Sequence, residues 1–347
     1  MKTNPLGRTG VHVSDICLGT MTWGEQNTEA DGHRQMDMAL AAGVNFVDTA
    51  EMYSTCPLRP ETRGRTEEII GSWFARTGRR NDVVLATKIV GDGIKWIRDG
   101  RPFRRADVMS AVEGSLRRMG VDHIDLYQLH WPNRGSYHFR KNWAFDASRQ
   151  DKSTTVDDIH ETLLGLDDAV KAGKIRAIGL SNDSAWGIMQ FVRLAEAHDL
   201  PRVASIQNEY NLLCRHFDLD LSEVAHHEDV GLLAFSPLAA GLLSGKYIGG
   251  VVPPGSRRSI IDTLGGRATA QADAATAAYV DIARTHGLDP AQMAIAFCRA
   301  RPFMTSTIIG ATTDAQLAIC LGAADLELSV GVMEAIDAVR RLHPMLL

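Results

Sequence analysis

The fold of this chain is constrained most by a repeated alternation of short apolar runs with stretches of helical periodicity. The apolar runs lie at positions 16–20, 44–47, 83–87, 124–129, 175–180, 203–206, 230–235 and 307–309. A helical stretch follows each run, and strands that alternate with helices pair in parallel, because only a parallel connection needs such a crossover. Eight such units predict an α/β fold of the (β/α)8 or TIM-barrel type.

The main alternative for this alternation is a doubly wound open sheet. That fold binds a dinucleotide at a GxGxxG turn after its first strand, and no such motif follows positions 16–20. Residues 4–14, NPLGRTGVHVS, predict a short β-hairpin ahead of the barrel, because a glycine-containing turn lies between two short runs. No linker or low-complexity segment divides the chain, so we expect residues 1–347 to form one barrel domain.

Helix ends and long connections can also be placed. Asp31 is expected to cap the first helix, and Gly43 to end it, because glycine is common just past the last helical residue. Long connections at 50–64, 131–155 and 236–269 follow the second, fourth and seventh strands. In a barrel these loops lie on the C-terminal face, where barrel enzymes carry their active sites.

The charge balance and the cysteine content exclude several classes of protein. The chain has 42 acidic and 37 basic residues and a formal net charge of −5, which provides no basic surface for nucleic acid. Its five cysteines contain no CxxC pair, which favours a reducing compartment over a disulfide framework. No apolar signal region opens the chain, and the most apolar stretch, 230–245, is too short to span a membrane. We therefore expect a cytoplasmic protein with no membrane partner.

Polar side chains stand at the ends of several consecutive predicted strands. These residues, together with a tyrosine on the loop after the second strand, are Asp48, Tyr53, Lys88, His130, Asn182 and Gln207. A barrel directs the carboxyl ends of its strands toward one face, so we expect these side chains to share one small volume.

Four of these side chains form a set suited to proton transfer at a carbonyl or an alcohol. The hydroxyl of a tyrosine such as Tyr53 has an ordinary pKa of about 10, and a nearby ammonium such as that of Lys88 lowers it. Asp48 would hold Lys88 in place, and His130 would donate a hydrogen bond to a substrate oxygen. Each residue alone also has a plain structural explanation, as part of a buried ion pair, a hydrogen-bonded histidine or a packed tyrosine. Their occurrence on consecutive strand ends favours catalysis.

No metal site is predicted. His226 and His227 are adjacent, so on a helix their side chains point about 100° apart, and no further ligand set accompanies them. The chemistry expected of the strand-end residues needs neither a metal ion nor a covalent nucleophile.

The motifs that contain these residues extend along most of the chain. They read LGTMTWG at 18–24, FVDTAEMY at 46–53, ATK at 86–88, YQLHWP at 127–132, GKIRAIGLSN at 173–182, FSPLAAGLLSGKY at 235–247 and STIIGATTDAQL at 306–317. In this order and combination the chain resembles the aldo-keto reductase superfamily. The segments MTWGEQN at 21–27 and RPETRG at 59–64 bring it nearest to the bacterial Tas-type reductases.

The resemblance implies an NADP(H)-dependent oxidoreductase that reduces the aldehyde or ketone group of a small molecule to an alcohol. Hydride would come from the nicotinamide of NADPH, and the proton would come from Tyr53. Lys88, paired with Asp48, would lower the pKa of Tyr53, and His130 would orient the carbonyl. The reaction would also run in reverse, from the alcohol and NADP+.

The same resemblance assigns positions to the cofactor. Ser181, Asn182 and Gln207 would bind the nicotinamide carboxamide, and the ring of Phe235 would stack under the nicotinamide. Contacts to the pyrophosphate, the 2′-phosphate and the adenosine would come from Ser236, Pro237, Leu238, Gly241, Ser244, Lys246, Arg257, Gly310, Thr312 and Gln316.

Two features bear on the strength of cofactor binding. Lys246 and Arg257 would supply positive charge to the 2′-phosphate, which favours NADPH over NADH. The family often has Glu and Asn three and four residues after the position of Gln316, where they contact the adenine, and this chain has Ile319 and Cys320 instead. Contacts to the adenine are therefore expected to be fewer than in the family pattern.

The substrate pocket is expected to be walled by Trp23, Tyr53 and Trp131, together with the loop at 132–155. Four aromatic residues occur in this loop, namely Tyr137, Phe139, Trp143 and Phe145. They favour an apolar or aromatic substrate, or alternatively they pack the loop onto the barrel or onto a neighbouring subunit. The sequence predicts neither the natural substrate nor the oligomeric state.

Two other functions are compatible with parts of this pattern. Some relatives of the superfamily act as regulatory subunits of ion channels, but here all four catalytic positions are occupied and no extra N-terminal segment is visible. A barrel aldolase would instead use Lys88 to form a Schiff base. The motifs at 235–247 and 306–317 favour nicotinamide chemistry over that alternative.

Overall fold

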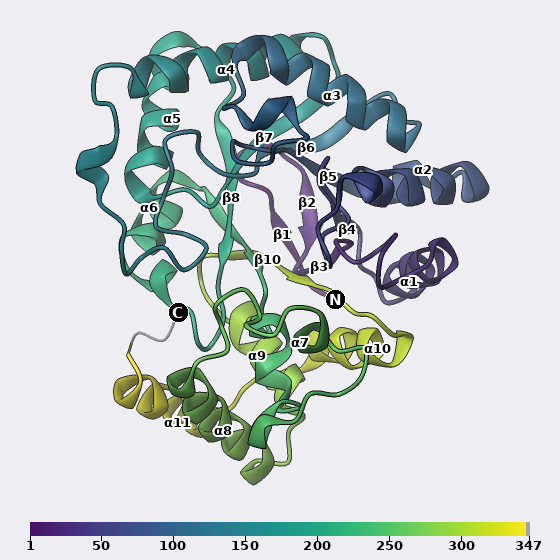
Figure 1. Cartoon of the computed structure of the whole chain (residues 1–347), viewed down its shortest axis with the longest axis vertical. Helices are drawn as coiled ribbons and strands as arrows, with labels where there is room; N and C mark the ends of the chain where they lie inside the picture. The colour runs from purple at the N-terminus through teal and green to yellow at the C-terminus, as the bar shows by residue number, and fades with distance from the viewer. Residues whose placement is uncertain (345–347) are drawn as a thin grey trace.

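The computed structural model describes residues 1–344, and a closed barrel of eight parallel strands lies at its centre (Figure 1). Around the barrel the strands follow one another in the order β10, β3, β4, β5, β6, β7, β8, β9. Their bounds are β3 Ile16–Gly19, β4 Phe46–Asp48, β5 Val84–Ile89, β6 Ile124–Leu129, β7 Ile175–Ser181, β8 Val203–Glu209, β9 Gly231–Phe235 and β10 Met304–Ile309. The predicted (β/α)8 barrel is confirmed.

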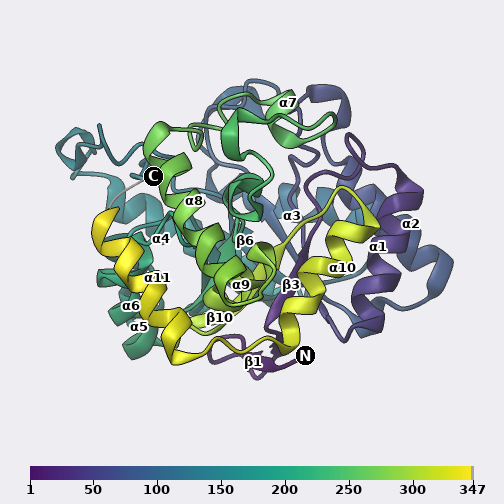
Figure 2. The ribbon, with the colours of Figure 1, turned by 90° about the horizontal axis from the view of Figure 1, so that it is seen from below.

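Helices form an outer layer around these strands, and Figure 2 shows α10 beside α1 on one side and α11 beside α8 on the other. Their bounds are α1 Glu29–Ala41, α2 Arg65–Thr77, α3 Arg105–Met119, α4 Thr155–Lys171, α5 Ala185–His198, α6 Asp220–Glu228, α7 Arg257–Ile260, α8 Ala270–Thr285, α9 Pro290–Arg299, α10 Asp314–Gly322 and α11 Val330–Leu342. Among residues 1–344, no helix is both long enough and apolar enough to cross a membrane.

The first helix begins one turn earlier than its predicted cap. Thr28 is the N-cap of α1, and its hydroxyl accepts a hydrogen bond from the backbone N–H of Asp31. The Asp31 carboxylate in turn accepts from the backbone N–H of Thr28, which completes a capping box. Asp31 therefore caps from the third helical position rather than from the N-cap itself. At the other end Gly43 has φ +86°, as predicted for a residue just past a helix.

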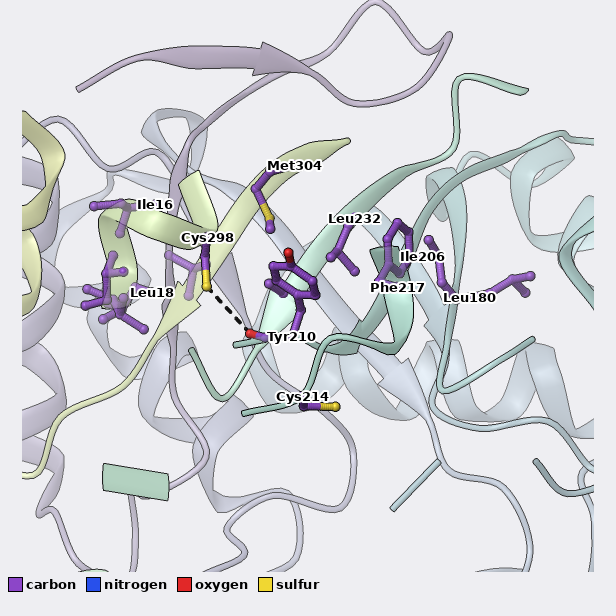
Figure 3. Packing of buried hydrophobic residues seen from close by; sticks show 14 of the residues in the cluster. Ile16, Leu18, Leu180, Ile206, Tyr210, Cys214, Phe217, Leu232, Cys298 and Met304 are labelled. Atoms are coloured by element: carbon purple, nitrogen blue, oxygen red, sulfur yellow. Dashed lines mark hydrogen bonds between the residues drawn. The ribbon is translucent and has the colours of Figure 1, made fainter. Parts of the chain in front are cut away.

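Each barrel strand is buried on both faces, which explains why the strands read as continuous apolar runs. Along β3, Ile16 and Leu18 pack with the outer layer, whereas Cys17 packs with the residues inside the barrel. Figure 3 shows part of the outer cluster, where the Cys298 thiol of α9 donates to the carbonyl oxygen of Tyr210 at 3.6 Å. Strands and helices are thus joined mainly by apolar packing.

The N-terminal hairpin closes the barrel at the N-terminal ends of its strands. Strands β1 (Thr3–Pro5) and β2 (His12–Ser14) pair antiparallel, which confirms the hairpin predicted at 4–14. Leu6 and Val13 are fully buried and pack against interior residues, including Phe46. Gly7 has φ +55°, and a Cβ atom there would lie 2.6 Å from the carbonyl oxygen of Ala204, so only glycine fits without rearrangement.

Candidate active site

A cavity of about 650 Å³ opens at the C-terminal ends of the barrel strands. Its floor includes Asp48, the last residue of β4, and Gln207, which lies two residues before the end of β8. Its walls come from the three long connections at 50–64, 131–155 and 236–269 and from the segment after β10. The sequence placed the candidate residues at this end of the barrel, and the cavity lies there.

A buried ion pair forms the base of the site. Lys88 Nζ donates to Asp48 Oδ2 at 2.5 Å and to the carbonyl oxygen of Thr49 at 2.7 Å. The pair forms because β4 and β5 are neighbours: Asp48 lies opposite Ala86, two residues before Lys88. Lys88 is fully buried. Burial disfavours its ammonium, but the carboxylate of Asp48 beside it raises the pKa of Lys88 above its ordinary value, so Lys88 is charged.

Two glutamines hold the second oxygen of Asp48. Gln128 Nε2 donates to Asp48 Oδ1 at 3.0 Å, and Gln207 Nε2 donates to the same oxygen at 2.9 Å. Gln128 was not among the residues predicted from the sequence. The two-residue period of a strand could have indicated it, because Gln128 lies on β6 two positions before His130 and its side chain is expected on the same face. The carboxylate orientation is therefore fixed from three strands besides its own.

Tyr53 lies on the loop after β4, directly over the ion pair. Lys88 Nζ is 5.2 Å from the centroid of the Tyr53 ring, and the ring meets that of His130 edge to face at 5.7 Å. Burial raises the pKa of the Tyr53 phenol, and the charge of Lys88 opposes this rise without overcoming it. The predicted effect of Lys88, a lowering of the pKa of Tyr53, is therefore present, but desolvation of the phenolate outweighs it in this structure. Tyr53 is a protonated phenol here.

His130 directly follows β6 and lines the same cavity. Burial and the charge of Lys88 both hold the pKa of His130 well below its ordinary value, so the imidazole is neutral. Its Nδ1 is buried and has no hydrogen-bond partner among the described residues. A neutral imidazole carries one N–H donor, which suits it to orient a carbonyl oxygen.

Polar groups at the ends of β7 and β8 line the cavity next to Phe235. Ser181 donates to the carbonyl oxygen of Gln207 at 2.8 Å, and Asn182 Nδ2 donates to Ser181 Oγ and to the carbonyl oxygen of His130, each at 2.9 Å. Asn182 Oδ1 is buried without a partner among residues 1–344. An unmet acceptor beside an aromatic ring fits the carboxamide N–H of a nicotinamide.

The loop after β9 folds into a series of tight turns along the cavity. Ser236, Ala239, Ala240 and Gly241 all have φ between 48° and 95°. The Nε atom of Arg257 is buried with no partner in the described part of the chain, and Arg257 lines the same cavity. Unmet N–H donors near a glycine turn fit an anionic group such as a phosphate.

Every position assigned to the cofactor by resemblance lines this one cavity. The set is Ser181, Asn182, Gln207, Phe235, Ser236, Pro237, Leu238, Gly241, Ser244, Lys246, Arg257, Gly310, Thr312 and Gln316. Ile319 and Cys320, which depart from the family pattern, line it too. Ile319 is 40% exposed, whereas Cys320 is buried, and burial raises the pKa of its thiol to about 12.

The substrate side differs in part from the prediction. Trp131 lines the cavity, and Phe139 packs edge to face against it at 6.0 Å. The assignment of Trp23 is wrong. Trp23 is fully buried beneath the site, where its indole N–H donates to Gln35 at 2.9 Å and its ring lies over Gly32. A motif position next to a cavity is no guide to side-chain direction, and this side chain points into the core.

The remaining loop aromatics lie away from the cavity. Tyr137 packs edge to face against Phe145 at 6.0 Å, and Trp143 is 70% exposed. None of these three is among the lining residues, so the loop contributes Phe139 alone of its four aromatics. Tyr137 also meets the ring of His216, which follows β8, at 6.2 Å, and this contact agrees with the alternative that the loop aromatics pack the loop onto the barrel.

Three charged residues of the cavity region were missed by the sequence analysis: Glu209 of β8, Arg140 and Arg267. Arg140 and Arg267 come from the two long loops after β6 and β9 and both contact Glu209. Glu209 had a signal, since it lies two positions after Gln207 on the same strand face. No such sequence pattern could have indicated Arg140 and Arg267, because side chains on irregular loops do not alternate with a regular period.

The burial of Lys88 bears on the aldolase alternative. All its surface is covered, and its ammonium is held by Asp48 and Thr49, so it presents no free amine to the cavity. Within residues 1–344, no group of three or more histidine, cysteine or carboxylate side chains is arranged to hold a metal ion.

Comparison with known proteins agrees with this geometry. The model of the Aldo/keto reductase family matches residues 15–341. The chain is 44% identical to protein Tas of Escherichia coli over 346 residues, which covers 99% of each chain. It is 32% identical to the uncharacterized oxidoreductase YrpG of Bacillus subtilis over 98% of this chain and 96% of that one. It is also 30% identical to a probable voltage-gated potassium channel subunit beta of rice, over 99% and 98% of the two chains. With the family model covering nearly all of its length, this chain belongs to the aldo/keto reductase family and is an oxidoreductase.

Proposed function

We propose that the protein reduces aldehydes or ketones to alcohols with NADPH, and that Tyr53 donates the proton. The observation that carries this proposal is the stack at the cavity floor. A protonated phenol, Tyr53, lies over the charged ammonium of Lys88, which Asp48 holds at 2.5 Å. This arrangement suits a general acid, because Tyr53 becomes a phenolate when it donates its proton, and the ammonium of Lys88 stabilises that phenolate.

Unmet polar groups of the cavity lining support this cofactor. Asn182 Oδ1 offers an unmet acceptor to a carboxamide, and Arg257 Nε offers an unmet donor to a phosphate. Phe235 lines the same cavity and offers an aromatic ring for stacking. When bound there, the reduced nicotinamide supplies a hydride.

Side chains of this protein then bind and protonate the carbonyl oxygen of the substrate. The N–H of neutral His130 and the hydroxyl of Tyr53 both donate hydrogen bonds to that oxygen and hold it in one place. As the oxygen gains negative charge, Tyr53 transfers its proton. The adjacent Lys88 ammonium stabilises the phenolate that remains, and Asp48 keeps Lys88 in position.

We expect NADPH to support turnover of at least one carbonyl compound and to bind more tightly than NADH. A panel of aldehydes, ketones and quinones, followed by the loss of NADPH absorbance, tests the activity. If the 2′-phosphate gains one charge-assisted contact worth about 1.5–3 kcal/mol, NADPH binds roughly 10- to 150-fold more tightly. Fluorescence titration gives both dissociation constants.

The matched variants for this test are Arg257→Met and Arg258→Met. Arg257 lines the cavity, whereas Arg258 lies over the ring of Tyr247 with 5.9 Å between its guanidinium carbon and the ring centroid. Arg257→Met is expected to remove most of the preference, and Arg258→Met to keep it. Equal constants for the two cofactors in the unmodified protein contradict the assignment. Cofactor binding without turnover of any compound on the panel contradicts the enzyme activity itself and favours a sensor.

Replacing Ile319 with glutamate is expected to tighten NADPH binding. Ile319 is 40% exposed on the adenosine side, so a carboxylate there can reach solvent and accept from the adenine amino group. One added hydrogen bond of about 0.5–1.5 kcal/mol corresponds to roughly a 2- to 12-fold lower dissociation constant. The turnover rate at saturating NADPH stays the same. Cys320 is left alone because an amide in that buried position has no partner. An unchanged dissociation constant shows that the adenine binds elsewhere.

A further inference from the structure

A cluster of three charged side chains beside the cavity plays no part in the proton transfer proposed above. Arg267 donates from Nε and Nη2 to the two oxygens of Glu209, at 2.7 and 2.8 Å. Its Nη1 donates to the carbonyl oxygen of Leu264 at 2.9 Å. Arg140 Nη1 donates to Glu209 Oε2 at 2.6 Å. Both arginines line the cavity, so the cluster faces the space where a substrate would lie.

This cluster contains one more positive charge than negative. Glu209 and Arg267 are only 7% and 5% exposed, and the side chain of Arg140 is 16% exposed. Arg140 Nε is buried with no partner in the described part of the chain. Burial, followed by the charge of Arg267, lowers the pKa of Arg140, as expected for a guanidinium short of negative charge. A buried excess cation with an unmet donor is costly unless an anion joins it.

The position of Arg140 connects it to the reacting group. Successive ring contacts lead from Tyr53 to His130 at 5.7 Å, from His130 to Trp131 at 4.9 Å and from Trp131 to Phe139 at 6.0 Å. Arg140 is the next residue after Phe139. Tyr53, the aromatic rings of Trp131 and Phe139, and Arg140 thus all line one cavity, which offers a substrate an acid, an apolar wall and a cation.

We propose that the substrate is a carbonyl compound that also carries a carboxylate, and that Arg140 binds this carboxylate. Arg267 holds Glu209, and Glu209 holds Arg140, so the ion pairs keep Arg140 in place at the cavity wall. Trp131 and Phe139 contact the apolar part of the substrate between its two polar ends. This inference rests on the proposed reductase activity and deepens it by naming the substrate class.

The test compares each acid with its uncharged ester. The probes are 3- and 4-formylbenzoate and their methyl esters, with NADPH as donor. The unmodified protein is expected to favour at least one acid over its ester in kcat/KM. Arg140→Met is expected to reduce that preference about tenfold or more, mainly through KM, because a charge-assisted hydrogen bond is lost. Activity on the esters stays nearly unchanged.

Lys141→Met is the matched control, because it removes the same charge from the next residue, which is exposed and does not line the cavity. It is expected to keep the preference, and Arg140→Lys to keep part of it. Equal losses on acid and ester in Arg140→Met show that the cluster only holds the loops together, which overturns the proposal. A weaker dissociation constant for NADPH with an unchanged preference assigns Arg140 to the cofactor and also overturns it.

A binding measurement separates this proposal from the reductase activity. Calorimetry on the protein with NADP+ compares benzoate with benzamide, which have similar shapes and different charges. Benzoate is expected to bind at least about tenfold more tightly, and Arg140→Met to abolish the difference. If no aldehyde or ketone is reduced but benzoate is still selected, the reductase activity fails and the anion site stands. If aldehydes are reduced but neither assay distinguishes acid from neutral compound, the anion site fails alone.

Discussion

Replacing Tyr53 with phenylalanine is expected to lower kcat by about 100- to 10,000-fold, the usual contribution of a general acid. The ring keeps its contacts with Lys88 at 5.2 Å and with His130 at 5.7 Å, so the site keeps its shape and loses only the hydroxyl. NADPH binding is expected to be nearly unchanged, because the loop at 236–246 is untouched. Single-turnover rates with saturating NADPH measure the effect on the chemical step.

Tyr137→Phe is the control for this loss. Tyr137 lies on the loop after β6, packs against Phe145 and does not line the cavity, so removing its hydroxyl leaves kcat unchanged. If His130 were the sole acid, Tyr53→Phe would keep most of its activity. Retention of more than about a tenth of kcat removes Tyr53 from the role of proton donor.

Replacing Lys88 with methionine is expected to lower both the activity and the stability. The change leaves the carboxylate of Asp48 buried, with only the amides of Gln128 and Gln207 as partners. Breaking a buried ion pair in this way costs about 3–5 kcal/mol of the free energy of unfolding. Tyr53 also loses the charge that opposes its raised pKa, so the phenolate left after proton transfer is disfavoured. Urea unfolding and steady-state kinetics measure the two effects.

Two variants separate these effects. Lys174→Met removes a lysine whose ion pair with Glu113 is partly exposed, so it should cost at most about 1 kcal/mol. The double change of Lys88→Met with Asp48→Asn removes the orphaned charge and is expected to regain part of the stability but none of the activity. Recovery of activity in the double variant contradicts the role of Lys88. An unfolding free energy for Lys88→Met within about 1 kcal/mol of the unmodified protein contradicts the buried ion pair.

The barrel was predictable because its signal is periodic and repeated. The strands expected at 124–129 and 230–235 agree with β6 and β9 to within one residue at each end. The strand expected at 44–47 begins at Phe46, because the first residues after Gly43 form the link from the helix. Local turn geometry decides such boundaries, and it leaves little trace in hydropathy.

The part of the site that lies at the ends of the barrel strands was predictable from the sequence. Asp48, Lys88 and His130 stand at strand ends, and the barrel alone brings them together. Residues on the long loops required the resemblance to a family, which placed the cofactor positions on one cavity but assigned Trp23 the wrong direction. Arg140 and Arg267 were invisible to both approaches, because their meeting at Glu209 depends on how two irregular loops fold over the barrel.

The N-terminal hairpin, which covers the end of the barrel opposite the cavity, also determines how solvent reaches the site. Leu6 and Val13 have no exposed surface and pack among interior residues such as Phe46 and Leu233, so apolar side chains close this end of the barrel. A proton given up by Tyr53 must then be replaced from the loop side. Under the proposed mechanism, reprotonation of Tyr53, entry of the carbonyl compound and release of the alcohol all take place through the same opening of the cavity. The alcohol must therefore leave through this opening before the next carbonyl compound can bind.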